Sequence, residues 1–179
     1  YYQNAGEPNP VSGSWNVSFV QGGPQLPASI TVDSLGSWTD FVGDEYKAFS
    51  GTAVYTTTIN KVPVADVIKL DLGSVAENAS VYLNGDYIGT VIDSPYQLYI
   101  PAEKFKGQDE LVVRVANSMA NRIAYMDKKG VDWKIFYNVN MSARKKENVK
   151  NGIFDASDWE PKSSGLLGPV TLTPAMVKQ

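Results

Sequence analysis

The feature that most restricts the fold of this chain is a two-residue alternation of apolar and polar side chains, repeated in five short segments. Successive side chains of a β-strand point to opposite faces of a sheet, so each segment predicts a strand with one face on a core. The positions predicted to face the core are Trp15, Val17 and Phe19; Ala53, Tyr55, Thr57 and Ile59; Ile68, Leu70 and Leu72; Leu111, Val113 and Val115; and Val170 and Leu172. Gly, Pro, Asn and Asp separate the segments, and this pattern of short strands predicts an all-β sandwich.

The stretch Val81–Val91 contains two short apolar runs that are joined at Asn84-Gly85. A two-residue type I′ turn needs positive φ at both central residues, which Gly adopts freely and Asn at low cost. The dipeptide therefore predicts the corner of a β-hairpin rather than a ligand-binding loop.

Composition excludes several classes of function. The chain has 179 residues, and it contains no cysteine and no histidine. Ser-His-Asp and Cys-His nucleophilic sites and His-ligated metals are thereby excluded. The net charge of -3 argues against nucleic acid as a partner, because a basic face is needed to neutralise phosphates. No apolar run approaches the roughly 20 residues of a membrane helix, so no membrane insertion is expected.

We expect one domain over residues 1–179, with residues 1–13 as a linker or N-terminal extension. Residues 117–165 are rich in Asn, aromatic and charged residues with weak alternation, and they predict a loop-rich insertion. The first ten residues, YYQNAGEPNP, lack the charged and apolar regions of a signal peptide and do not begin with Met. We therefore expect the chain to be part of a longer protein.

Six motifs follow one another along the chain, from Phe49 to about residue 173. They read FSGTAVYTTTI, IKLDLGSV, ASVYLNGDYIGTV, SPYQLYIP, GQDELVVRVAN and SGLLGPVTL. In this order they resemble the sugar-binding domain of family 2 glycoside hydrolases, a jelly-roll β-sandwich of the galactose-binding-domain type. One departure is GPV in the last motif, where the family usually has Arg-x-Val.

The flanking stretches WNVSF with GGP, LGSWTDF, NRIAYMD and SGLLGPV are most similar to the C-terminal domain of large α-L-rhamnosidase-like enzymes of Bacteroidetes. This resemblance implies a non-catalytic accessory or sugar-binding domain of a multidomain glycoside hydrolase that acts on plant or host polysaccharide. Its partners would be the catalytic domain of the parent chain and carbohydrate, and the parent would be exported to the periplasm or cell surface. Two alternatives stay open: an independent carbohydrate-binding module, and a glycosidase in its own right.

Glycosidases use a pair of carboxylates, one of them in an apolar pocket. None of the 19 acidic residues is turned inward beside an aromatic wall by the alternation, so we assign no catalytic residue. Family 2 enzymes do contribute an acidic residue to the neighbouring catalytic barrel, shortly before the Ser-Gly of the last strand. Asp158 lies near this position, one residue further away, and the resemblance implies that role for it. An ordinary turn residue is the alternative.

Aromatic rings in irregular segments are candidates for sugar recognition, because a ring face covers the C–H face of a pyranose. Polar neighbours could bond the hydroxyl groups. The candidate contacts to carbohydrate or to a partner domain are Trp38, Arg122, Asp127, Trp133, Tyr137, Asp158 and Trp159. The alternative is that these rings close the ends of the sandwich. We expect the insertion to lie at one end or flank of the sandwich.

No cofactor is predicted. A structural Ca²⁺ is common in this fold and would take loop carboxylates and carbonyls, but the chain has no EF-hand-like spacing that assigns its ligands.

Overall fold

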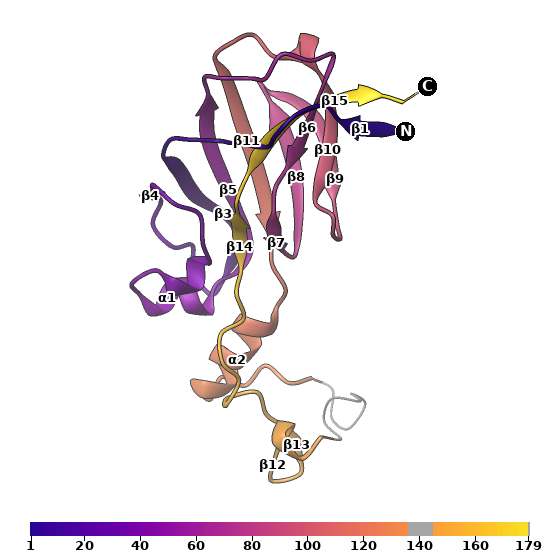
Figure 1. Ribbon diagram of the computed structural model, residues 1–179. Coiled ribbons are helices and arrows are strands. Elements are labelled where there is room, and N and C mark those ends of the chain that lie inside the picture. Colours follow the sequence, from indigo (N-terminus) through magenta and orange to yellow (C-terminus); the bar gives the residue numbers. More distant parts are fainter. Residues whose placement is uncertain (136–144, 179) are drawn as a thin grey trace.

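Two antiparallel sheets pack face to face in the computed structural model, which describes residues 1–135 and 145–178 (Figure 1). Side chains from both sheets form one hydrophobic core. Every position that the alternation predicts to face this core is buried. The predicted all-β sandwich is therefore confirmed, and the order of its motifs along the chain agrees with a jelly-roll arrangement of the galactose-binding-domain type.

The larger sheet has six strands in the order β4-β3-β5-β11-β8-β9. Its strands are β3 (Trp15–Gly23), β4 (Ile30–Val32), β5 (Ser50–Ile59), β8 (Asn78–Leu83), β9 (Asp86–Val91) and β11 (Asp109–Ala116). The central pair, β5 and β11, is in register from Ile59↔Asp109 to Thr52↔Ala116. This unbroken ladder gives the sheet a regular centre.

The second sheet has five strands in the order β1-β15-β6-β10, and β2 also pairs with β15. Its strands are β1 (Tyr2–Asn4), β2 (Asn9–Pro10), β6 (Val67–Asp71), β10 (Gln97–Pro101) and β15 (Thr171–Val177). The sequence predicts a linker or N-terminal extension over residues 1–13; in the structure Tyr2–Asn4 and Asn9–Pro10 pair with β15, so these two parts belong to the sheet. The first ten residues are all exposed. The sequence therefore has no alternation of apolar and polar side chains here that could predict the pairing.

The remaining elements are short. Two further strand pairs are β7 (Ser74–Ala76) with β14 (Gly165–Gly168) and β12 (Val149–Lys150) with β13 (Ile153–Phe154). The helical elements are η1 (Trp38–Asp40), α1 (Asp44–Ala48), η2 (Ala102–Lys104), α2 (Ala120–Lys128) and η4 (Lys146–Asn148). None of the described helices is long and apolar enough to cross a membrane.

Trp38 belongs to the core, so its assignment as a surface contact is wrong. Its side chain is fully buried, and its ring meets the edges of Phe19 and Phe49 at centroid distances of 5.6 Å. The cause is local. The Ser37 hydroxyl caps η1 by accepting the amide proton of Thr39, and Ser164 donates its backbone N–H to the same oxygen at 2.9 Å. This bonding fixes the turn that points the indole into the sandwich.

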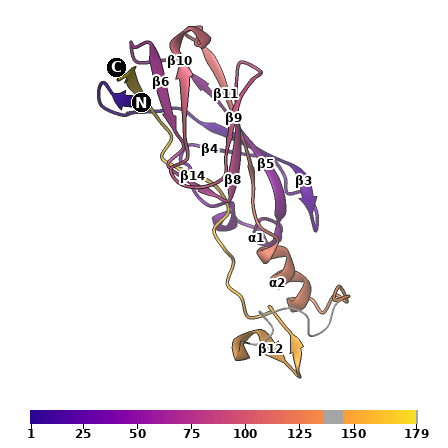
Figure 2. The ribbon, with the colours of Figure 1, turned by 90° about the vertical axis from the view of Figure 1, so that its right-hand side faces the viewer.

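The insertion extends the molecule at one end. Figures 1 and 2 show α2 and the β12–β13 hairpin beyond the sandwich, at the end far from both termini. We call the described part of residues 117–165 the extension. Its position agrees with the prediction that the insertion lies at one end of the sandwich.

The Asn84-Gly85 dipeptide is the corner of the β8–β9 hairpin, as predicted. Both residues have positive φ, 52° and 86°. The Asn84 side chain also donates to the buried carboxylate of Asp109 at 2.7 Å and accepts the amide proton of Glu110 at 3.0 Å. The corner is therefore bonded to the start of β11, and these contacts give it a structural role.

Replacing Gly85 by valine should lower the free energy of unfolding by about 1–3 kcal/mol, because a β-branched residue is strained at positive φ. Nothing lies within 4 Å of the added Cβ, so the loss would come from the backbone conformation alone. Gly36→Val is the matched control, since Gly36 also has open space around it but no positive φ. Denaturant unfolding of both variants checks this. Equal losses for the two would contradict it.

Candidate functional site

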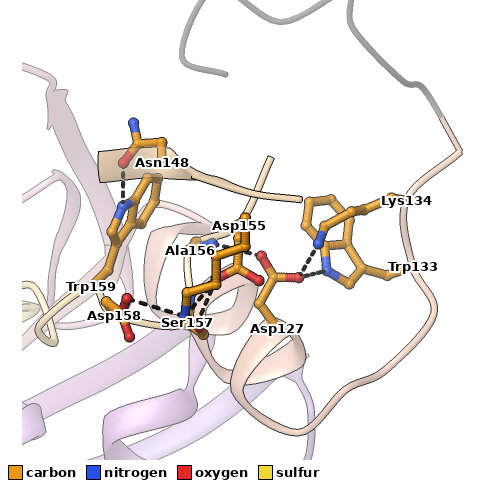
Figure 3. Close-up of polar contacts among 10 residues, drawn as sticks. Asp127, Trp133, Lys134, Asn148, Asp155, Ala156, Ser157, Asp158 and Trp159 are labelled. Atoms are coloured by element: carbon orange, nitrogen blue, oxygen red, sulfur yellow. Dashed lines mark hydrogen bonds and ion pairs between the residues drawn. The ribbon is translucent and has the colours of Figure 1, made fainter. Parts of the chain in front are cut away.

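The centre of the extension is the carboxylate of Asp127, whose side chain is only 1% exposed. It accepts the indole N–H of Trp133 at 2.6 Å and the backbone N–H of Ala156 at 2.7 Å, and it pairs with Lys134 at 2.8 Å (Figure 3). Asp127 itself lies at the end of α2, and its donors come from the residues after the helix and from the returning chain. One buried acid therefore holds three segments together.

A row of aromatic rings lies beside this carboxylate. Phe154 meets Trp133 and Trp159 edge to face, at centroid distances of 6.4 and 5.8 Å. The Trp159 indole N–H donates to the Asn148 side-chain oxygen at 2.9 Å. The three rings are half-buried and lie outside the hydrophobic core of the sandwich. The extension therefore has a small packing centre of its own.

A second Asn-Gly hairpin forms the outer end of the extension. Asn151 and Gly152 have φ values of 52° and 78°, and they join β12 to β13. Both have the conformation of the Asn84-Gly85 corner. The Asn-Gly dipeptide of KNGI is the same turn signal in the sequence.

An ion cluster supports this hairpin from one side. Lys150 lies 3.4 Å from an Asp155 oxygen and 3.1 Å from an Asp158 oxygen. The hydrogen bond from the Ser157 hydroxyl is the main reason that the pKa of Asp155 lies below its ordinary value. The hydrogen bond to Asp158 raises the pKa of Lys150. Lys150 and Asp155 therefore stay charged at neutral pH, although exposed pairs of this kind add little stability.

An open groove of about 520 Å³ lies between α1, α2 and residues 157–161. Its lining from the two helices is Asp44, Lys47 and Ala48 on α1, and Asn121, Ala124, Tyr125, Lys128 and the following Lys129 on α2. The returning chain adds the lining residues Ser157, Asp158, Trp159, Glu160 and Pro161. Charged groups of both signs therefore meet two aromatic rings in one hollow.

The structure separates the residues that the sequence proposed as contacts. Asp158 and Trp159 line the groove. Asp127 and Trp133 are neighbours in the packing centre of the extension, and the Asp127 carboxylate is out of reach of a ligand. Arg122 lies elsewhere, with its guanidinium against Gly23. Tyr137 lies outside the described residues.

Most of the groove was missed because its walls come from short helices. Asp44, Lys47 and Ala48 follow an i, i+3, i+4 spacing, and so do Asn121, Ala124 and Tyr125. Side chains at these spacings share one face of a helix. The spacing was present in the sequence, but it becomes informative only once both segments are known to be helical.

The buried acids and the acids of the groove differ in their surroundings from the general acid of a glycosidase. Buried Asp109 and Asp127 already accept bonds from protein donors, and the groove acids Asp44, Asp158 and Glu160 are exposed. A general acid in a glycosidase is instead enclosed by apolar groups. No group of three or more acidic side chains within residues 1–135 and 145–178 is arranged to hold a metal ion.

Comparisons with known proteins place this fold among glycoside hydrolases. A rhamnosidase from Novosphingobium sp. PP1Y matches 98% of the chain with a TM-score of 0.74 and 28% identity, although the match is only 15% of that enzyme. A family 2 β-galacturonidase from Eisenbergiella tayi matches 96% of the chain and 26% of its own length, with a TM-score of 0.54. At 16% identity, this second match supports the fold alone.

A sequence relative leads to the same class of protein. A Formosa agariphila protein named "Putative beta-glucuronidase" is 32% identical over 181 residues. The match covers 93% of this chain and 16% of the relative. No protein-family model matches the chain. The chain spans about one sixth of the length of the Formosa relative and of the Novosphingobium rhamnosidase.

The described geometry predicts that Asp127→Ala opens the extension and leaves the sandwich folded. The change leaves the N–H groups of Trp133 and Ala156 without their acceptor, which should cost about 3 kcal/mol of local stability. Faster hydrogen exchange at Ala156, with little change at Val113 in the sheet, would show this. Asp132→Ala is the control, because Asp132 is an exposed acid of the same segment with no bond among the described residues. Unfolding of the whole domain together would contradict the prediction.

Proposed function

We propose that this chain, which is a small accessory domain of the glycoside hydrolase type, supports the catalytic part of its parent enzyme and does not hydrolyse glycosides itself. The proposal rests on the shares of this chain and of the rhamnosidase that match one another. Nearly the whole chain, extension included, matches one part of a rhamnosidase and leaves 85% of that enzyme outside the match, since the matched share is 15%. The exposed groove acids and the occupied buried acids support the non-catalytic half of the proposal.

The parent enzyme would be α-L-rhamnosidase-like and act on plant or host polysaccharide. The flanking motifs of the sequence and the match to the Novosphingobium rhamnosidase support this choice. The Formosa relative supports an origin in Bacteroidetes, although its name points to a glucuronidase. Because polysaccharides are too large to enter a cell intact, such a parent would be exported to the periplasm or the cell surface.

The extension is the surface that we propose for docking on the catalytic part. Residues 117–165 carry nine Lys and Arg against six Asp and Glu, whereas the rest of the chain carries seven against thirteen. The insertion therefore has a net charge of +3 and the remainder a net charge of -6. A partner surface that is acidic would be attracted to the extension and repelled by the sandwich. Asp158, on an exposed turn of the extension, is then placed at the rim of that contact.

The isolated chain should not release nitrophenol from nitrophenyl rhamnosides, galactosides or glucuronides, because no enclosed acid and base pair is present among the described residues. The full-length parent, assayed under the same conditions, is the positive control. Turnover by the chain clearly above that of a heat-denatured sample would end the accessory-domain proposal.

Docking should depend on the lysines of the extension. Reversing both Lys145 and Lys146 to Glu should slow association with the parent lacking this domain by about threefold to tenfold, because rim charges act mainly on the association rate. The matched control reverses the exposed Lys104 and Lys106 at the opposite end of the sandwich. Surface plasmon resonance at two salt concentrations gives both rates. Equal effects from the two pairs would argue against docking through the extension.

A further inference from the structure

We propose that the groove between α1, α2 and residues 157–161 is a subsite for a neutral sugar unit of a glycan. The inference goes beyond the accessory role, because it holds whether or not the domain docks on a catalytic partner. The volume of about 520 Å³ is within the range of small-molecule sites, roughly 300–1,000 Å³. Three separate segments form its walls, and each contributes polar side chains.

Two aromatic rings give the groove a place for the apolar face of a pyranose. Trp159 is held by its indole bond to Asn148 and by the edge contact with Phe154. Tyr125 lies on α2, with the Lys129 ammonium 5.7 Å from its ring centroid. Both rings are half-buried, so part of each surface is accessible from the groove. Because the Trp159 ring is fixed before a ligand arrives, little side-chain freedom is lost on binding.

The polar groups of the groove match the hydroxyls of a sugar. Lys47 and Lys128 can donate, and Asp44 and Glu160 can accept. None of these four side chains forms a hydrogen bond or ion pair with another side chain in the part of the chain that the structure describes. A hydroxyl group both donates and accepts, so a mixed set of this kind satisfies it from either side.

The balance of charge selects a neutral ligand over an anionic one. Three acidic side chains, Asp44, Asp158 and Glu160, and three lysines, Lys47, Lys128 and Lys129, line the groove, so the charges of the two signs are equal in number. A uronate or phosphate would meet Asp44 and Glu160 at close range, where like charges repel. Docking of a protein segment fits less well, since the apolar lining apart from the two rings consists of small residues, Ala48, Ala124 and Pro161.

The test is titration of the 179-residue chain with the methyl glycosides of L-rhamnose, D-galactose, D-mannose and D-glucose, followed by amide chemical shifts. We expect at least one to bind with a Kd in the millimolar range and to shift amides of α1, α2 and residues 157–161. Methyl glucuronide, the acidic counterpart of methyl glucoside, should bind more weakly than the best neutral probe.

The variants separate binding from folding. Tyr125→Ala should weaken the best neutral probe at least tenfold, whereas Tyr125→Phe should keep most of the affinity because the ring remains. Tyr87→Ala is the matched control, an exposed tyrosine on β9 that is far from the groove in sequence and fold. Glu160→Gln should also weaken binding, and Glu103→Gln on η2 should not.

Three outcomes would overturn the proposal. The first is no shift in the groove with any neutral probe at about 50 mM, a concentration that would reveal a millimolar Kd. The second is binding that Tyr125→Ala leaves unchanged. The third is tighter binding of the glucuronide than of every neutral probe. Any of these results leaves the accessory role intact, because docking and the lack of hydrolysis are measured separately.

Discussion

The extension is joined to the sandwich by the hydrogen bonds of two asparagine side chains, Asn117 and Asn121, which we call the polar seam. The Asn117 side chain accepts the backbone N–H of Gly51 at 2.8 Å and donates to the Ser164 hydroxyl at 2.9 Å. Asn121 bonds both backbone groups of Lys162, accepting at 2.8 Å and donating at 2.9 Å. These amides satisfy backbone groups where the strands end, and unmet bonds there would be costly. The same contacts fix the first turn of α2.

Beyond the seam, the chain is held by polar contacts rather than by a large apolar core. The sandwich packs alternating side chains between two sheets, whereas the extension gathers donors around the Asp127 carboxylate and a row of three rings. A buried carboxylate is stabilising only while its donors stay in place. This arrangement is specific but local, so the extension can lose its order at a lower free energy than the sheets.

The difference between the apolar core of the sandwich and the polar contacts of the extension explains which features could be predicted from the sequence. Strands with one buried face leave a periodic record, so every position predicted to face the core is buried, although other core residues such as Val75, Ile100 and Leu166 were not predicted. Trp38 was misjudged because its irregular neighbourhood hides the Ser37 cap that turns the ring inward. Helix α2 was missed because it is short and because Met119, the residue before its first turn, forms no side-chain cap. The role of Asp127 depends on Ala156, 29 residues away, and no local pattern encodes a contact of that kind.

The groove and the packing centre of the extension are mechanically linked. Ala156, bonded to Asp127, directly precedes the groove residue Ser157, and Trp159 belongs both to the aromatic row and to the groove. The returning wall of the groove therefore keeps its position only while the buried carboxylate keeps its donors. A partner that orders the extension would, by the same contacts, order this wall and reduce the conformational freedom that a sugar must restrict. Docking and glycan binding would then favour one another, and by linkage the effect is equal in both directions.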